Sequence, residues 1–197
     1  MITLDQQGSR RVGDRVDILL AELRRFPAGL TRPFERTIGD EVQAVLKDPV
    51  LAVDVTLHVL RLGGWSVGIG AGPVNEPLPA SARAASGAAF VLARRAVERA
   101  KSRLRPVPLA VEGSDVERAG EAEAVLTLLG SIVSRRTDAG WAVIDALGSG
   151  APATQNSVAA DLGITQQAVS QRLRAAMWAE EMAVRPVAAR LLIEGER

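Results

Sequence analysis

The chain has 197 residues, of which 47% are hydrophobic and 24% charged, with 24 basic and 23 acidic side chains. This length and apolar content suffice for one large or two small domains, and we expect two. Because the chain has no cysteine and no apolar segment of membrane length, we exclude disulfides and thiolate metal sites and expect a cytoplasmic protein with no part in a membrane.

Hydrophobic periodicity predicts alternating strands and helices in the first half of the chain. A strand is expected at 1–5, followed by a helix that is ended by Pro27 and Gly29 and whose apolar face carries Val12, Val16, Leu19, Leu20 and Leu23. A hairpin is expected at 34–46, turning at Gly39 and Asp40, and then a helix at 49–62 capped by Asp48. The remaining expected elements are a strand at 65–69, a basic helix at 87–104 and an edge strand at 106–111. Five strands with the helices on one face predict an α+β sheet of the ferredoxin-like, or palm, type.

The chain after Gly113 is predicted to be helical. A long helix carries Val125, Leu129, Ile132 and Val133 on one face, which we interpret as a connector or the seam of a homodimer. A last short helix is expected to start at Arg185 and Pro186. The expected domains are an α+β domain at 1–113, a connector at 114–136 and an all-α domain at 137–197.

The segment from Thr154 to Ala176 has the pattern of a helix-turn-helix. Ala159 is small enough to let two helices touch, and Gly163 supplies the turn. Apolar residues fall where the angle between the helices must be closed, at Val158, Leu162, Ile164, Val169 and Leu173. The alternative is an ordinary helical hairpin in an Ala-rich protein.

Polar residues follow an equally ordered pattern on the second of these helices. Thr165 is expected to cap it, and glutamine side chains then project from its outer face. A glutamine can read an adenine edge in the major groove of DNA. The expected DNA-binding residues are Thr165, Gln166, Gln167, Ser170, Gln171, Arg172 and Arg174.

The charge of the helical half argues against tight DNA binding. Residues 137–197 hold five Arg against four Glu and three Asp, whereas phosphate binding favours a basic surface. Additional positive charge could come from dimerisation, from Arg135 and Arg136, or from residues 94–105, which contain six basic residues and one Glu. The alternative for residues 94–105 is a solvated helix face.

Two carboxylates are predicted to meet in the first half. Asp5 ends the first strand and Asp40 lies at the hairpin tip, and in a palm sheet these strands are neighbours. Such a pair can hold Mg²⁺ or Mn²⁺ and, through it, a nucleoside triphosphate. The alternative, which we slightly favour, is that Asp40 only forms the turn and Asp5 only caps a loop.

Four short blocks resemble the SatD family of bacterial proteins: LDQQGSR at 4–10, GDEVQAVL at 39–46, SVGIGAGPV at 66–74 and GAAFVLARRAVERAK at 87–101. The resemblance covers nearly the whole chain and implies an N-terminal region followed by a C-terminal helix-turn-helix. The same blocks are distantly similar to class III nucleotide cyclase domains.

The cyclase similarity implies roles for several residues. It places the two metal aspartates on Asp5 and Asp40, the base-selecting lysine near Arg36 and the transition-state arginine near Arg95. The lysine is replaced here, and Val91 stands at the position of the ribose-orienting asparagine. These departures argue against efficient cyclisation and are compatible with a metal or nucleotide pocket.

Two further motifs are weaker. The glycine-rich stretch 68–72 follows a strand without opening a helix, so we expect close backbone packing there and not a phosphate-binding loop. His58 shares a helix face with Asp54 and Arg61, and without a second histidine or a cysteine we interpret them as a solvated polar stripe.

The sequence therefore favours a bacterial DNA-binding regulator with an N-terminal sensor or nucleotide-binding-like domain, DNA as its partner and a nucleotide as a candidate effector. The alternatives are a metal-dependent nucleotidyl transferase or cyclase-like enzyme with a regulatory helical tail, and a scaffold with neither activity. We assign no catalytic residue and no certain cofactor.

Overall fold

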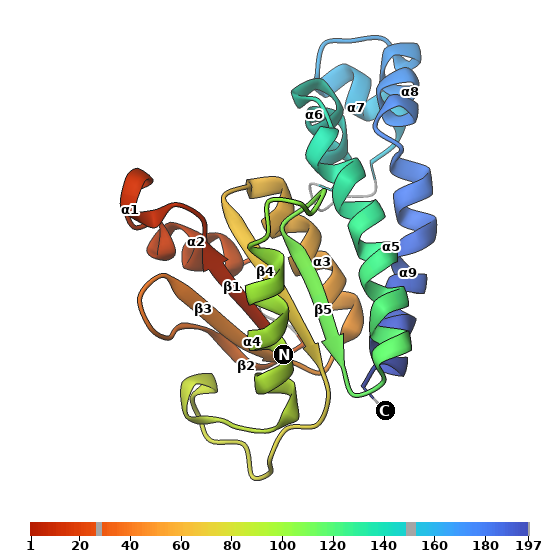
Figure 1. Cartoon of the computed structure of the whole chain (residues 1–197). Coiled ribbons are helices and arrows are strands. Elements are labelled where there is room, and N and C mark those ends of the chain that lie inside the picture. Colours follow the sequence, from red (N-terminus) through yellow and green to blue (C-terminus); the bar gives the residue numbers. More distant parts are fainter. Residues whose placement is uncertain (27–28, 149–152, 197) are drawn as a thin grey trace.

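The computed structural model describes residues 1–26, 29–148 and 153–196, which form a mixed α+β structure (Figure 1). The strands are β1 (Ile2–Gln6), β2 (Leu30–Arg36), β3 (Glu41–Leu46), β4 (Trp65–Ala71) and β5 (Leu109–Gly113). They form one sheet in the order β2-β3-β1-β4-β5, in which β4 and β5 run parallel and the other neighbours antiparallel. The predicted succession of strands, and the edge position of the last one, are confirmed.

The helices are α1 (Ser9–Val12), α2 (Val16–Leu23), α3 (Pro49–Leu62), the single-turn η1 (Ala82–Ala84), α4 (Ala88–Ala100), α5 (Val116–Arg135), α6 (Asp138–Leu147), α7 (Gln155–Asp161), α8 (Gln166–Ala175) and α9 (Trp178–Glu194). Of these described helices, none combines the length and apolarity needed to cross a membrane.

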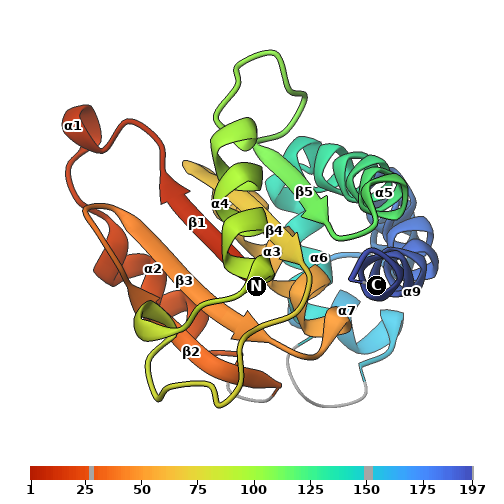
Figure 2. The same cartoon turned by 60° about the horizontal axis from the view of Figure 1, so that its bottom comes forward.

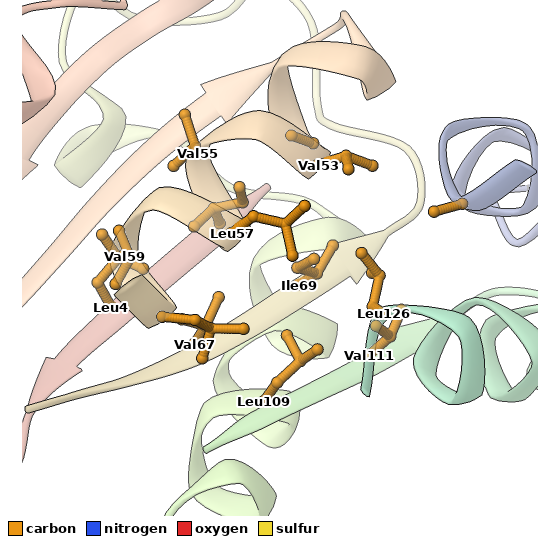
Figure 3. Packing of buried hydrophobic residues seen from close by; sticks show 14 of the residues in the cluster. Leu4, Val53, Val55, Leu57, Val59, Val67, Ile69, Leu109, Val111 and Leu126 are labelled. Carbon is orange, nitrogen blue, oxygen red and sulfur yellow. The ribbon is translucent and has the colours of Figure 1, made fainter. Parts of the chain in front are cut away.

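Helices cover both faces of the sheet, so the expectation that they lie on one face is wrong. In β4, the side chains of Val67 and Ile69 point toward α3 and α5 (Figures 1 and 3). Gly68 and Gly70 lie on the opposite face of the strand, against the backbone of α4. Successive residues of a strand alternate between faces. The glycine side of β4 therefore accepts one closely packed helix, and the branched side holds the main core.

The main core joins the sheet to α3 and α5, with Leu4, Val59 and Ile69 among its buried residues (Figure 3). Leu129 and Val133 of α5, predicted to form a dimer seam, are buried in the same core. Val125 also packs against this core, so three of the four predicted seam residues are covered within the chain and only the partly buried Ile132 lies outside the core. The sequence-based reason for a homodimer seam on α5 is therefore weakened.

The last helix returns to the sheet half of the molecule. Ala188, Leu191 and Leu192 of α9 belong to the main core, and α9 runs alongside α5 (Figure 2). Pro186 lies inside α9, so the expected start of a new helix there is wrong. The helix stays continuous because the residues after the proline pack in the core and Glu181 and Arg185 before it form ion pairs. The domain ranges 1–113, 114–136 and 137–197 stay a prediction, although the last of them shares the core of the first.

The first predicted helix is split in two. Val12 ends α1 and is 52% exposed, Gly13 has a φ of +80°, and α2 begins at Val16, whose backbone N–H donates to the side chain of Asp14. The loop between them breaks the helical spacing that the apolar residues had suggested. Helix α2 ends at Leu23, and Pro27 lies outside the described residues.

Candidate functional site

The predicted recognition segment consists of two capped helices. Thr154 begins α7, because its Oγ1 accepts a hydrogen bond from Ser157 N at 3.2 Å and its own N–H donates to Ser157 Oγ at 2.9 Å. Thr165 begins α8 by accepting a bond from Ala168 N at 3.1 Å. Gly163 has a φ of +63°, which glycine adopts without Cβ strain. The predicted turn residue and the Thr165 cap are confirmed.

A small apolar cluster holds α6, α7 and α8 together. Val143, Val158 and Val169 are fully buried at its centre. Ala159 is buried beside them, so that α7 and α8 approach closely at this small side chain. The residues predicted to close the angle all belong to this cluster, namely Val158, Leu162, Ile164, Val169 and Leu173. Because this cluster fixes the rotation of α8, the opposite face of that helix faces solvent.

The outward face of α8 is polar. Thr165, Gln166, Gln167, Gln171 and Arg174 are exposed, while Ser170 and Arg172 are partly buried. Gln166 Nε2 donates to Gln155 Oε1 of α7 at 2.6 Å, which ties that side chain to its neighbour. Within the described residues, neither Arg172 nor Arg174 has an ion pair. The exposed guanidinium of Arg174 is therefore available to an external anion, and Arg172 is only partly accessible.

Arg136 does not belong to this surface, contrary to expectation. Its side chain is 1% exposed, and its Nη2 lies 2.5 Å from Glu181 Oε2 and 2.8 Å from the carbonyl oxygen of Ala176. Its guanidinium also stacks over the ring of Trp141 at 4.4 Å from the centroid. A charge enclosed in this way cannot reach a DNA phosphate, and of the two expected arginines only Arg135 is exposed.

The polar stripe on α3 is a contact surface and not a solvated one. Arg61 Nη1 and Nη2 each lie 2.6 Å from a carboxylate oxygen of Asp145 in α6, and the guanidinium is 3.8 Å from the centroid of Trp141. Asp54 accepts a hydrogen bond from Arg185 Nη1 of α9 at 2.7 Å. These pairs fix α6 and α9 against α3, which connects the helical half to the sheet half.

His58 lies in the middle of the same stripe. Its side chain is 11% exposed, its Nε2 is 3.7 Å from Glu22 Oε2, and its ring meets Phe26 edge-on at 5.4 Å between centroids. Burial lowers the pKa of His58, and the positive charges of Arg25 and Arg61 lower it further. The expectation that His58 is solvated is therefore wrong.

Of the two predicted metal aspartates, Asp5 lies in β1 and Asp40 lies in the turn just before the neighbouring strand β3. Gln6 N of β1 donates to the carbonyl oxygen of Asp40 at 3.3 Å. On β3, however, the residue directly opposite Asp5 is Glu41 and not Asp40. Asp5 Oδ2 lies 3.0 Å from Lys101 Nζ. Burial raises the pKa of Asp5, and the hydrogen bond from Lys101 opposes that rise. An ammonium group thus already supplies the positive charge that a metal ion would bring.

The groups predicted to complete a nucleotide site are dispersed. Arg36 forms an ion pair with Asp14 and donates to Gly39 O at 2.7 Å, while Arg95 is exposed on α4. Among the described residues, no hydrogen bond or ion pair joins either arginine to Asp5 or Asp40. The same residues contain no cluster of three or more His, Cys, Asp or Glu side chains that could hold a metal.

Beside Asp5 lies a groove of about 910 Å³ whose basic lining the sequence analysis missed. It is enclosed by α1, the ends of β1 and β4, and the segment after α4. We call it the basic groove, and its charged residues are Asp5, Arg10, Arg11, Arg15, Lys101, Arg103 and Arg105. The sequence signal was the arginine-rich stretch 8–15, which lies in a loop and short helix without periodicity.

The glycine-rich stretch at the end of β4 is a packing surface, as expected. A Cβ on Gly68 would lie 2.3 Å from Val97 N, and one on Gly70 would lie 2.2 Å from Ala89 O. Distances this short leave no room for a side chain or a phosphate between β4 and α4.

Comparison of the chain with protein-family models, with curated proteins and with solved structures gives no match.

Proposed function

We propose that this chain is a bacterial DNA-binding transcriptional regulator, in which α7 and α8 form a helix-turn-helix and α8 enters the major groove. The observation that carries the proposal is the outward face of α8, where Gln167 and Gln171 stand beside the unpaired Arg172 and Arg174. Amide side chains can read base edges, and guanidinium groups can bind phosphates. Such a regulator acts in the cytoplasm.

In this proposal the sheet half is a palm-like sensor domain, consistent with the resemblance to the SatD family. The ion pairs from Arg61 and Asp54 of α3 to α6 and α9 support a sensing role, because they join the sheet half to the helices that carry α8. A homodimer would double the limited positive charge and match a two-fold operator. Since α5 buries its apolar face internally, such a dimer would use another surface.

The proposal is tested by selecting bound fragments from a genomic DNA library and measuring their mobility shift across a salt series. We expect a bound subset that shares a sequence and is released as salt rises, because phosphate contacts release counterions. Failure to shift any fragment at micromolar protein and low salt would overturn the regulator proposal.

A second candidate function is a metal-dependent nucleotidyl transferase or cyclase-like activity at Asp5 and Asp40. The adjacency of β1 and β3 favours it, whereas the ion pair between Asp5 and Lys101 argues against it. Mg²⁺ or Mn²⁺ with a nucleoside triphosphate would stabilise the folded protein by about 2.7 kcal/mol at a hundredfold excess over Kd. A thermal shift that requires the metal and disappears in Asp40→Asn would support this candidate, and a shift without metal would not.

A further inference from the structure

The basic groove has more basic side chains than acidic partners for them. Lys101 is paired with Asp5, and Arg105 with Glu123. The remaining four guanidinium groups lining it have no ion pair among the described residues: Arg10, Arg11, Arg15 and Arg103. Like charges that converge on one concave surface repel one another, and an anion bound between them relieves that repulsion.

The groove is also held in shape by polar side chains at its base. Gln6 Nε2 donates to Gly13 O at 2.6 Å, and Gln6 Oε1 accepts from Arg15 N at 2.8 Å. One buried glutamine therefore ties both ends of the loop after α1 to the end of β1. At the same site, Gln7 Nε2 donates to the hydroxyl of the fully buried Ser66 at 3.2 Å. The arginine-bearing segment is thus fixed over the groove.

We propose that the basic groove binds a polyphosphate anion, either free or as the phosphate tail of a nucleotide. Guanidinium groups bind phosphate oxygens with paired, charge-assisted hydrogen bonds, and four unpaired guanidinium groups match several phosphate charges better than one carboxylate. The volume of about 910 Å³ is within the usual range for small-molecule sites. This site takes its positive charge from the protein, so it requires no metal ion.

The basic groove lies close to the contact between the sheet half and the helical half. A second groove of about 810 Å³ shares Gln7, Gly64 and Pro108 with the basic groove and extends to Trp141 and Asp145 of α6. An anion bound beside Gln7 would therefore lie next to the contact between α3 and α6. This regulatory consequence rests on the proposed regulator, whereas anion binding itself does not.

The test is isothermal titration of the full chain with tripolyphosphate, ATP and a DNA oligonucleotide, each in EDTA. The variant is Arg11→Ala/Arg103→Ala, whose exposed side chains have no ion pair within residues 1–26, 29–148 and 153–196. The matched control is Arg94→Ala, an exposed arginine outside the groove that likewise has no ion pair within those ranges. We expect tripolyphosphate or ATP to bind the wild type, the groove variant to weaken Kd by about tenfold or more, and the control to bind like the wild type.

The arms of this titration separate the sources of the phosphate. Binding of both small ligands supports recognition of the polyphosphate alone, and binding of ATP only supports a nucleotide. The inference is overturned if neither binds at millimolar concentration, if Arg94→Ala weakens binding equally, or if the groove variant loses only DNA binding. Because the groove does not include α8, loss of polyphosphate binding with intact DNA binding would leave the proposed function standing.

Discussion

Arg136 and Glu181 form a fully enclosed ion pair, with side chains 1% and 0% exposed and 2.5 Å between Nη2 and Oε2. Arg185 contacts the other oxygen of the same carboxylate, at 2.9 Å from its Nε. The pair lies where α5, α6 and α9 meet, at the C-terminal end of α8, whose capping residue Ala176 accepts a hydrogen bond from Arg136. Because both charges are removed from water, each one is stabilised mainly by its charged partner.

Removing Glu181 should therefore destabilise the protein strongly. Glu181→Ala leaves the guanidinium of Arg136 buried without its carboxylate, which costs about 3–5 kcal/mol of the free energy of unfolding. Urea unfolding followed by linear extrapolation measures the loss. Glu180→Ala, at the exposed neighbouring position, is the matched control and should change the free energy by less than about 0.5 kcal/mol. Equal effects of the two substitutions would contradict this account of the junction.

Gly68 and Gly120 should respond oppositely to alanine. A Cβ at Gly68 meets the α4 backbone at 2.3 Å, so Gly68→Ala must push α4 off the sheet and cost about 3 kcal/mol or more. Gly120 is exposed in α5 with nothing within 4 Å of a Cβ, so Gly120→Ala should stabilise the protein by about 0.4–1 kcal/mol. Melting temperatures that moved in the same direction would refute the close packing of α4 on β4.

His58 should make stability depend on pH. Because burial lowers its pKa from 6.5, the unfolded chain binds a proton at a pH where the folded protein does not. The contribution of His58 to the free energy of unfolding should therefore decrease as the pH falls through 6.5. Urea unfolding at about pH 7.5 and about pH 5.5 gives this change, and His58→Gln should reduce it. The two aspartates with raised pKa, Asp5 and Asp54, are present in both proteins, so identical pH profiles would exclude a buried neutral His58.

The features that sequence could predict are those set by neighbouring residues. The caps at Asp48 and Thr165 and the turn at Gly163 depend on a few adjacent residues, and the structure shows each of them. The succession of strands and helices along the first half of the chain also followed from local periodicity. By contrast, the coverage of both faces of the sheet depends on the packing of α4 against Gly68 and Gly70. The sequence signal for it was the alternation of branched residues and glycine in β4.

The candidate sites were harder to predict because partners in them are distant in the chain. A count of charges could not show that Arg136 is buried against Glu181, or that Arg61 pairs with Asp145. The polar spacing on α3 was visible, but polar spacing is typical of a solvated face and of an ion-paired contact alike. The basic groove contains Arg11 and Arg103, which are far apart in the sequence and are brought together only in the folded chain.

The central claim, that α8 binds DNA, is tested most directly by the salt dependence of affinity for a selected fragment. Fluorescence anisotropy would compare the wild type with Arg174→Ala, Gln167→Ala and the control Arg190→Ala, an exposed arginine on α9. We predict that Arg174→Ala weakens binding to all sequences and lowers the slope of log K against log salt by about one. Gln167→Ala should lose about 1–3 kcal/mol of discrimination at one base position, while the control behaves as the wild type. Unchanged slopes and unchanged sequence preference in both α8 variants would contradict the account.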